Sequence, residues 1–366
     1  MINGKKIAVV VPCYNEQKQV GAVIETMPDF VDRIVVVDDL SKDGTISVVE
    51  RYIKQNTNDN KIIRTEKTNL EPSRYNRADI VMEEIIESEE SLYTPFEIYN
   101  KTPDSDRVIL IKHKKNGGVG ASITTGYKWC RDHNIDCTAV MAGDGQMDPA
   151  ELESICMPVV NGDVDYVKGN RLIHRSAPYV IPKIRYWGNS LLSMLTKIAS
   201  GYWHISDTQT GYTAISLQAL KSIPLHKIYP KYGMPNDLLV KLNMAYCTVK
   251  EVGIKPVYNV GEQSKMKLWK VIPRISKLLI KSFFVRLFKK YFARDFHPLF
   301  LFYSFSMFLF VVNTPFIYRI IRDFCGKGRM VSPIDLIVFT TLCVASFQSF
   351  FFGMWMDIQE NERLYK

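Results

Sequence analysis

Paired cysteines are missing from this chain: its seven cysteines include no Cys-x-x-Cys motif and lie mostly within apolar segments. They look like reduced core residues, which is consistent with a cytoplasmic compartment. Internal repeats and low-complexity tracts are also absent. Residues 1–6 lead directly into an apolar run, so we expect no N-terminal signal peptide.

Acidic residues are absent from residues 273–294, where basic residues alternate with apolar ones at helical spacing. The basic residues are Arg274, Lys277, Lys281, Arg286, Lys289, Lys290 and Arg294. This pattern predicts a basic amphipathic helix at an anionic membrane surface, within a membrane-interface segment of residues 266–297. A solvated face on a soluble helix is the alternative. These charges supply much of the net charge of +9, so the charge does not indicate a nucleic-acid partner.

Charged residues of either sign are absent from residues 298–318 and 336–356. Each segment is long enough to cross the hydrocarbon core of a bilayer, which takes about 20 residues. The link 319–335 is short and contains glycine and proline. We therefore expect a transmembrane hairpin with a short tail in residues 298–366, and the lipid bilayer as a partner.

The orientation of this hairpin depends on basic residues near the ends of the spans, and both flanks are positive. The flank before the first span is the longer and has seven Lys and Arg residues, whereas the link has four. We expect the longer flank to decide the topology. Both termini, and the large N-terminal part of the chain, would then lie on the cytoplasmic face of an integral membrane protein.

The first 265 residues have the pattern of a soluble α/β domain, and the chain of 366 residues is long enough for more than one domain. Two β-branched runs, within residues 7–16 and 34–45, each end in polar and turn residues. With the helical stretch 18–27 between them, they predict a βαβ unit whose strand ends deliver polar groups to a crevice. An ordinary Rossmann-like half is the alternative, but it does not explain the acidic clusters that end both strands.

Further strands are expected at residues 61–65 and 107–113. Residues 66–106 between them are acidic and helix-prone, which predicts an inserted small surface subdomain. The glycine-rich residues 115–126 open a helix. Their exposed amides suit either a phosphate or a tightly packed corner between strand and helix.

A later strand, within residues 139–149, ends at Asp144 and Gln146. A carboxylate and an amide oxygen are hard ligands that could hold Mg²⁺ or Mn²⁺ against a diphosphate. The alternative is a plain turn in which the aspartate caps the backbone.

The first two strand ends, Pro-Cys-Tyr-Asn-Glu and Asp-Asp-x-Ser-x-Asp-Gly-Thr, resemble the N-terminal signature of the inverting family 2 glycosyltransferases. That resemblance implies the GT-A fold, a Rossmann-like α/β domain with a mostly parallel sheet and helices on both faces. The Asn-x-Gly-x-Gly segment at residues 116–120 is similar to one that follows the third strand in this family. The family's Asp-x-Asp motif is matched by Asp144 and Gln146, but Ala142 replaces its first acid, which puts the metal geometry in question.

The resemblance also implies a binding site for a nucleotide sugar linked to UDP or GDP. The implied site residues are Pro12, Tyr14, Glu16, Val37, Asp39, Gly143, Asp144 and Lys265. Asp144 and Gln146 would hold the metal, and Lys265 would neutralise diphosphate. The arginine that usually lies just upstream of this lysine is missing, with Asn259 nearby instead.

Two arginines, Arg171 and Arg185, lie where the polyprenyl-phosphate branch of the family, typified by dolichol-phosphate mannose synthase, clamps the acceptor phosphate. A planar guanidinium suits this role because it binds phosphate oxygens in pairs and stays charged. Asp237 occupies the position of the general base in enzymes with hydroxyl acceptors. A phosphate acceptor is already ionised and needs no base, so Asp237 would then orient the site.

The sequence therefore predicts a membrane-anchored enzyme that transfers a sugar, with inversion, from a nucleotide sugar to a polyprenyl phosphate. Transfer to a hydroxyl of a lipid-linked saccharide is the first alternative. A processive polysaccharide synthase is disfavoured, because the Gln-x-x-Arg-Trp signature is absent and two spans are few for a channel. A non-catalytic scaffold of the same fold is a further alternative, and a homo-oligomer is left open.

Overall fold

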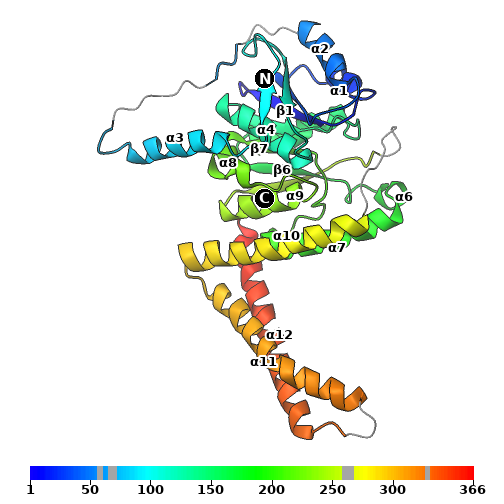
Figure 1. Ribbon diagram of the computed structural model, residues 1–366, viewed down its shortest axis with the longest axis vertical. Helices are drawn as coiled ribbons and strands as arrows, with labels where there is room; N and C mark the ends of the chain where they lie inside the picture. The colour runs from blue at the N-terminus through cyan, green and yellow to red at the C-terminus, as the bar shows by residue number, and fades with distance from the viewer. Residues whose placement is uncertain (56–60, 65–71, 258–267, 326–329) are drawn as a thin grey trace.

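The β-branched runs form the buried strands of one mixed sheet in a computed structural model that describes residues 1–55, 61–64, 72–257, 268–325 and 330–366 (Figure 1). The strands are β1 (Ile7–Cys13), β2 (Arg33–Asp38), β3 (Phe96–Ile98), β4 (Val108–His113), β5 (Cys137–Val140), β6 (Tyr166–Asn170), β7 (Thr213–Ser216) and β8 (Val249–Gly253). Within the described residues they are ordered β3-β4-β2-β1-β5-β7-β6-β8. The pairs β1–β2, β2–β4, β1–β5 and β6–β8 are parallel, and the other three are antiparallel.

Helices cover both faces of this sheet. The helices of the described chain are α1 (Val20–Glu25), α2 (Thr45–Gln55), α3 (Arg77–Glu90), α4 (Val119–Asp132), α5 (Leu152–Val160), α6 (Ala177–Val180), α7 (Lys183–Ser200), α8 (Leu217–Ser222), α9 (Met234–Met244), α10 (Leu268–Phe288), α11 (Pro298–Cys325) and α12 (Pro333–Glu362), with short 3₁₀ turns η1 (Pro149–Glu151) and η2 (Leu225–Lys227). One core lies between the sheet and α4, α8 and α9, and a second lies between the sheet and α1, α2 and α5. The predicted GT-A arrangement is confirmed.

The strand predicted at residues 61–65 is wrong for residues 61–64, which are coil, and Thr65 lies outside the described part of the chain. Ile62 is buried and donates its backbone N–H to Asp104 O at 2.9 Å. The edge of β4 is instead taken by β3, which pairs antiparallel with Phe96 opposite His113. The prediction rested on local apolar character alone, but it is the later segment β3 that pairs with β4.

The segment 66–106, which the sequence predicts to be an insertion, includes this edge strand and α3, which projects from the domain (Figure 1). The C-terminal end of α3 is attached to the domain by Glu89, whose carboxylate lies 3.0 Å from His226 Nδ1 and 3.7 Å from Arg131 Nη1. The described residues of this segment thus form one helix and one edge strand joined to the main sheet.

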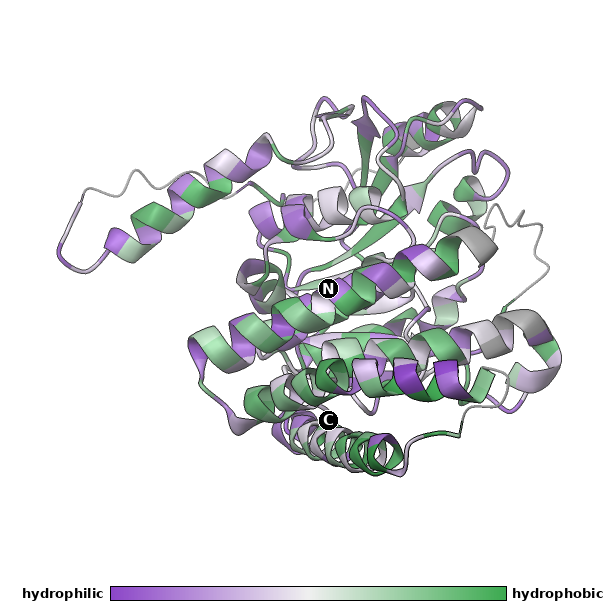
Figure 2. Ribbon diagram, turned by 60° about the horizontal axis from the view of Figure 1, so that its bottom comes forward, coloured by the Kyte–Doolittle hydropathy of each residue, from purple (hydrophilic) through white to green (hydrophobic). Residues whose placement is uncertain are grey.

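Two long helices, α7 and α10, lie side by side across the base of the domain (Figure 1). Leu192 of α7, Val240 of α9, and Ile275 and Leu279 of α10 share a small apolar core. Figure 2 shows hydrophobic residues along these basal helices. The helix α7 ends at Gly201, whose φ of 80° is the left-handed conformation that glycine adopts at helix ends.

The basic amphipathic prediction for residues 266–297 needs one correction. Arg286 on α10 and Lys290, in the π-helical segment η3 (Lys289–Arg294), point into the protein and are only 1% and 2% exposed. They meet buried oxygen acceptors from α7, α9 and α12. These two charges are therefore unavailable to an anionic membrane surface.

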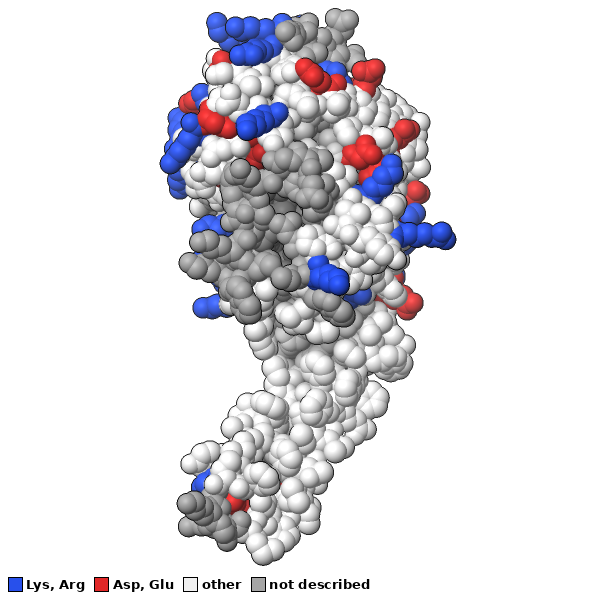
Figure 3. Space-filling view, turned by 90° about the vertical axis from the view of Figure 1, so that its right-hand side faces the viewer, with Lys and Arg blue, Asp and Glu red and all other residues white. Residues whose placement is uncertain are grey.

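The helices α11 and α12 form a hairpin, and both are long and apolar enough to cross a membrane. They are longer than the predicted spans 298–318 and 336–356 because the charged flanks are helical too. Figure 3 shows an uncharged stalk, with charges on the domain and again at the tip. After α12 the chain returns to the sheet: Val249 N–H donates to Leu364 O at 2.8 Å, and Lys366 N–H donates to Val249 O at 3.0 Å.

Candidate functional site

The predicted nucleotide-binding residues converge where β1, β2 and β5 end. The strand register places Pro12 opposite Val37, and Gly143 donates its N–H to Pro12 O at 3.4 Å. A Cβ atom on Gly143 would lie 2.6 Å from Cys13 Sγ, so only glycine allows this approach. The structure thus brings Pro12, Val37 and Gly143 together, as the sequence predicts.

The loops after β1 and β2 hold each other through hydrogen bonds that sequence reasoning missed. Asn15 accepts from Lys42 N–H at 2.7 Å, and its own N–H donates to Ser41 Oγ at 2.9 Å. Its φ of 58° is left-handed, a conformation in which asparagine is enriched. Glu16 N–H donates to Thr45 Oγ1 at 3.0 Å. Tyr14 and Glu16 therefore lie on a braced turn at the edge of the site.

Asp39 uses its carboxylate to fasten the glycine-rich loop to the end of β2. Its two oxygens accept the N–H groups of Gly117 and Gly118, each at 2.7 Å, and Oδ1 also lies 2.8 Å from His113 Nδ1. A side chain at Gly118 is excluded, because its φ is 92° and a Cβ would lie 2.7 Å from Pro230 O. The sequence left open whether this loop binds a phosphate or forms a packed corner between strand and helix. For the amides of Gly117 and Gly118 the structure shows the packed corner.

Asp144 and Gln146 lie together on the turn that follows β5. Asp144 Oδ1 accepts Gln146 N–H at 3.1 Å, and Gly145 between them has a φ of 74°. Gln146 Nε2 is buried without a hydrogen-bond partner in the described structure. Across those same residues, no three His, Cys, Asp or Glu side chains converge on a metal site. One carboxylate and one amide still fit Mg²⁺ or Mn²⁺, because such ions are commonly held by one or two protein carboxylates and by substrate phosphates.

Arg171 forms a two-pronged ion pair with Asp207, which sequence reasoning did not predict. Its Nε lies 2.8 Å from Oδ2 and its Nη2 lies 3.0 Å from Oδ1. Burial would raise the pKa of Asp207, but the Arg171 charge and hydrogen bonds outweigh it and hold that pKa below its usual value. The arginine is therefore kept in one orientation, with 21% of its side chain exposed.

A second carboxylate, that of the half-buried Glu251 on β8, supports the Asp207 loop. It accepts the N–H groups of Ser206 at 2.7 Å and Asp207 at 3.0 Å, and the Asn170 side-chain amide at 2.7 Å. Burial raises the pKa of Glu251. Nearby, Lys168 on β6 donates to Thr210 O at 2.7 Å, and burial lowers its pKa to about 8. Neither residue was singled out from the sequence, because only the pairing of β6 with β8 creates this cluster.

Asp237 is buried in the first turn of α9, and its carboxylate already has partners. Oδ2 accepts Tyr229 N–H at 2.7 Å and pairs with the Lys241 ammonium at 2.5 Å. This arrangement holds the segment before α9 in place. Arg185 lies on α7, but its side chain is outside the described residues, and so is the whole of Lys265.

Comparison with known proteins agrees with this architecture. The family described as Glycosyl transferase family 2 matches residues 8–78 and 88–223, more than half of the chain. The chain belongs to this family. It is a glycosyltransferase, and the break in the match falls within α3, which projects from the domain.

Two similar curated proteins act on dolichyl phosphate according to their names. A UDP-N-acetylglucosamine–dolichyl-phosphate N-acetylglucosaminyltransferase of Methanococcus voltae is 27% identical over 69% of this chain and 86% of its own. A dolichyl-phosphate β-glucosyltransferase of Trichomonas vaginalis is 22% identical over 77% and 74%. Among solved structures, glucosyl-3-phosphoglycerate synthase from Mycobacterium tuberculosis, in complex with Mn²⁺, UDP and glucosyl-3-phosphoglycerate, is 15% identical over 77% of this chain and 80% of its own, with a TM-score of 0.45.

Proposed function

We propose that this glycosyltransferase moves a sugar from a UDP- or GDP-linked donor to the phosphate of a polyprenyl-phosphate lipid, with inversion at the sugar. The observation that carries the proposal is the docking of an apolar hairpin onto a family 2 domain. The end of α12 is bound to α10 and α9 through Asp357 and Asn361, and the tail that follows it is bound to β8 of the catalytic sheet. The hairpin thus anchors the domain beside the bilayer, where a lipid phosphate emerges.

The state of Asp237 supports a phosphate acceptor. Its Oδ2 accepts a backbone N–H and pairs with a lysine, so this oxygen is not available as the general base that a hydroxyl acceptor would need. A phosphate is ionised at neutral pH and attacks without a base. Catalysis would then consist of positioning and of charge stabilisation at the departing diphosphate.

In this proposal each group of site residues has its own role. Tyr14, Glu16 and the β1 and β2 ends hold the nucleoside, and Lys265 neutralises diphosphate. Asp144 and Gln146 hold a divalent cation, which when bound stabilises the charge of the leaving group. Arg171, oriented by Asp207, binds the acceptor phosphate together with Arg185.

The proposed division of the chain follows the same logic. Residues 1–265 form the catalytic domain on the cytoplasmic face, residues 266–297 lie at the membrane interface, and residues 298–366 anchor the protein as an integral membrane hairpin. The names of two relatives, which mention dolichyl phosphate, support a lipid-phosphate acceptor. The five basic residues of the segment 273–294 other than Arg286 and Lys290 would contact anionic lipid headgroups.

The test is sugar transfer by the full chain in membranes, with short-chain polyprenyl phosphate and a panel of labelled nucleotide sugars. Product is counted in the organic phase. We expect transfer with one donor, its loss in excess EDTA, and its loss in Asp144→Asn. Asp163→Asn is the matched control, because Asp163 is exposed on the loop before β6. Full activity of Asp144→Asn, or label on a saccharide hydroxyl alone, would contradict the proposal.

A further inference from the structure

A stripe of exposed side chains runs along α12 on the face turned away from α11. We define the α12 stripe as Ile337, Thr341, Val344, Gln348, Phe351 and Trp355, all of which are exposed. Their spacing alternates between four and three residues, which is the spacing of a seam where two helices pack together. The stripe extends over most of the predicted second span.

The opposite face of α12 is already occupied by α11. Ser306 and Ser346 exchange hydrogen bonds, in which each hydroxyl donates to the other's backbone oxygen at 2.9 Å. A Cβ on Gly353 would lie 3.2 Å from the Tyr303 ring. Ser346 and Gly353 each lie two residues from a member of the stripe, which is about 200° around a helix. The α12 stripe is therefore left without a partner in the described hairpin.

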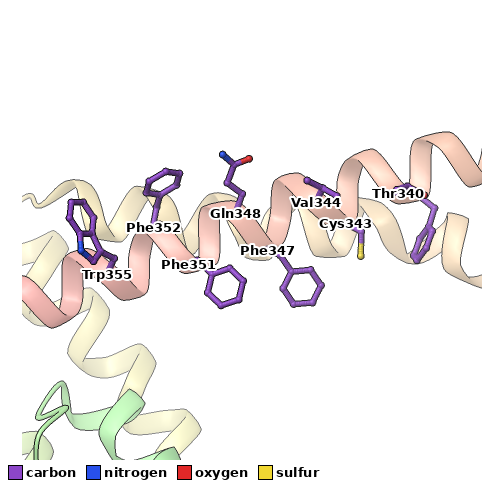
Figure 4. Close-up of a pocket in the computed structure, with 9 residues that line it drawn as sticks. Thr340, Cys343, Val344, Phe347, Gln348, Phe351, Phe352 and Trp355 are labelled. Atoms are coloured by element: carbon purple, nitrogen blue, oxygen red, sulfur yellow. The ribbon is translucent and has the colours of Figure 1, made fainter.

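The surface around this stripe has the shape that receives a helix. Side chains at four-residue spacing form two ridges, one through Val344, Gln348 and Phe352 and the other through Phe347 and Phe351. Figure 4 shows Val344, Gln348 and Phe352 on one side of the α12 ribbon and Phe347 and Phe351 on the other. The open groove beside these residues of α12 has a volume of about 770 Å³. Ridges of one helix that fit grooves of another are the usual basis of helix packing.

Gln348 indicates what fills this groove. It lies in the middle of the uncharged segment 336–356, and its amide has no hydrogen-bond partner among the residues that the structure describes. Lipid chains cannot satisfy an amide in the hydrocarbon core, where an unpaired polar group is strongly unfavourable. The occupant must therefore bring both a donor and an acceptor to this depth.

We propose that the α12 stripe packs against the same stripe of a second copy of this chain, with the two Gln348 amides hydrogen-bonded to each other. The proposal rests on the membrane location given under the proposed function. Two copies in one membrane share their orientation, so the paired helices run parallel about a twofold axis. An amide is self-complementary across such an axis, because each side chain carries both N–H donors and an oxygen acceptor.

The first test is disulfide crosslinking of the full chain in native membranes. Cys325 and Cys343 are replaced by serine, and single cysteines are introduced by Val344→Cys, Gln348→Cys or Phe351→Cys. Ala345→Cys and Ser349→Cys are the controls, because these positions lie at the same depth but off the stripe. We expect dimers at the three stripe positions and few at the controls. Equal crosslinking around the helix, or dimers at the controls alone, overturns the proposal.

The second test isolates the amide. Förster transfer between labelled copies is followed in phosphatidylcholine vesicles as the protein is diluted in lipid. Gln348→Leu should weaken association by about 3- to 30-fold, the range expected for one interhelical hydrogen bond in a membrane. Gln348→Asn should restore part of it, and Ser349→Ala should have no effect. Unchanged association of Gln348→Leu overturns the proposal.

A third test determines whether the groove on α12 instead holds the acceptor lipid or a different protein. If adding short-chain polyprenyl phosphate abolishes crosslinking at Val344→Cys, the groove holds the acceptor chain and the dimer is rejected. If crosslinking occurs only to a different protein, the dimer is also rejected. Because these measurements need no sugar transfer, a chain that dimerises but fails the transfer assay contradicts the proposed function alone.

Discussion

The buried ion pair between Arg286 and Asp357 offers the sharpest test of how the hairpin is joined to the domain. Arg286 Nη1 and Nη2 each lie 2.8 Å from one carboxylate oxygen of Asp357. The arginine also donates to Ala199 O at 2.9 Å and Ile198 O at 3.1 Å, at the end of α7. The pair thus joins α7, α10 and α12 at one point.

Asp357→Ala should destabilise the folded protein by about 3–5 kcal/mol, because it leaves a buried guanidinium without its counter-charge. No allowance for solvent screening is needed, since the two side chains are 1% and 0% exposed. The measurement is unfolding of the full chain in detergent micelles by denaturant, followed by intrinsic tryptophan fluorescence. Glu360→Ala is the matched control one turn later: its partner Arg363 is 64% exposed, so the loss should be about 0–1 kcal/mol.

A double variant tests whether the loss of stability comes from leaving one buried charge unpaired. Arg286→Met with Asp357→Leu removes both charges and leaves an apolar contact, so it should recover most of the stability that Asp357→Ala loses. A loss of less than about 1 kcal/mol in Asp357→Ala would refute the reasoning. The reasoning would also be refuted if the double variant lost as much stability as Arg286→Met and Asp357→Leu lose separately when added together.

Three further outcomes are expected. Asp39→Ala should weaken nucleotide affinity more than turnover, because it releases the glycine-rich loop from β2; unchanged affinity in calorimetry contradicts this. Arg171→Ala should raise the apparent KM for polyprenyl phosphate, whereas Asp237→Asn should keep a measurable rate; loss of a true base would cost a factor of about 10²–10⁴, so the reverse ranking favours a hydroxyl acceptor. The pKa of lysine in the unfolded chain is about 10.4, whereas burial lowers the pKa of Lys168 in the folded protein to about 8. Between these two pH values the unfolded state binds more protons than the folded state, so the folded protein becomes more stable as the pH rises. The stability of the wild type relative to Lys168→Met should therefore increase from pH 8 to 10.5, and a constant difference contradicts this.

The sequence alone determined the elements that depend on local patterns. The β-branched runs of β1, β2 and β4 are buried on both faces, so their apolar character is continuous and readable without a partner. The uncharged segments 298–318 and 336–356 are equally plain, because the length of a membrane span is set by the bilayer. The family motifs lie at the ends of parallel strands, which meet at a common edge of the sheet. The sequence therefore predicted that Pro12, Val37 and Gly143 lie together.

Only the tertiary structure decided how the charged side chains are used. The counter-charge of Arg286 lies 71 residues away in the chain, and the groups that the Asp39 carboxylate contacts lie 74 or more residues away, so no local pattern shows that one is buried and the other fastens a loop. Asp237 has a nearby lysine partner, yet its burial and its contact with Tyr229 depend on the packing of α9. The strand expected at residues 61–65 failed because β3 takes the edge of β4. Hydrophobic runs are recognisable by themselves, whereas the role of a charge depends on which distant groups the fold brings to it.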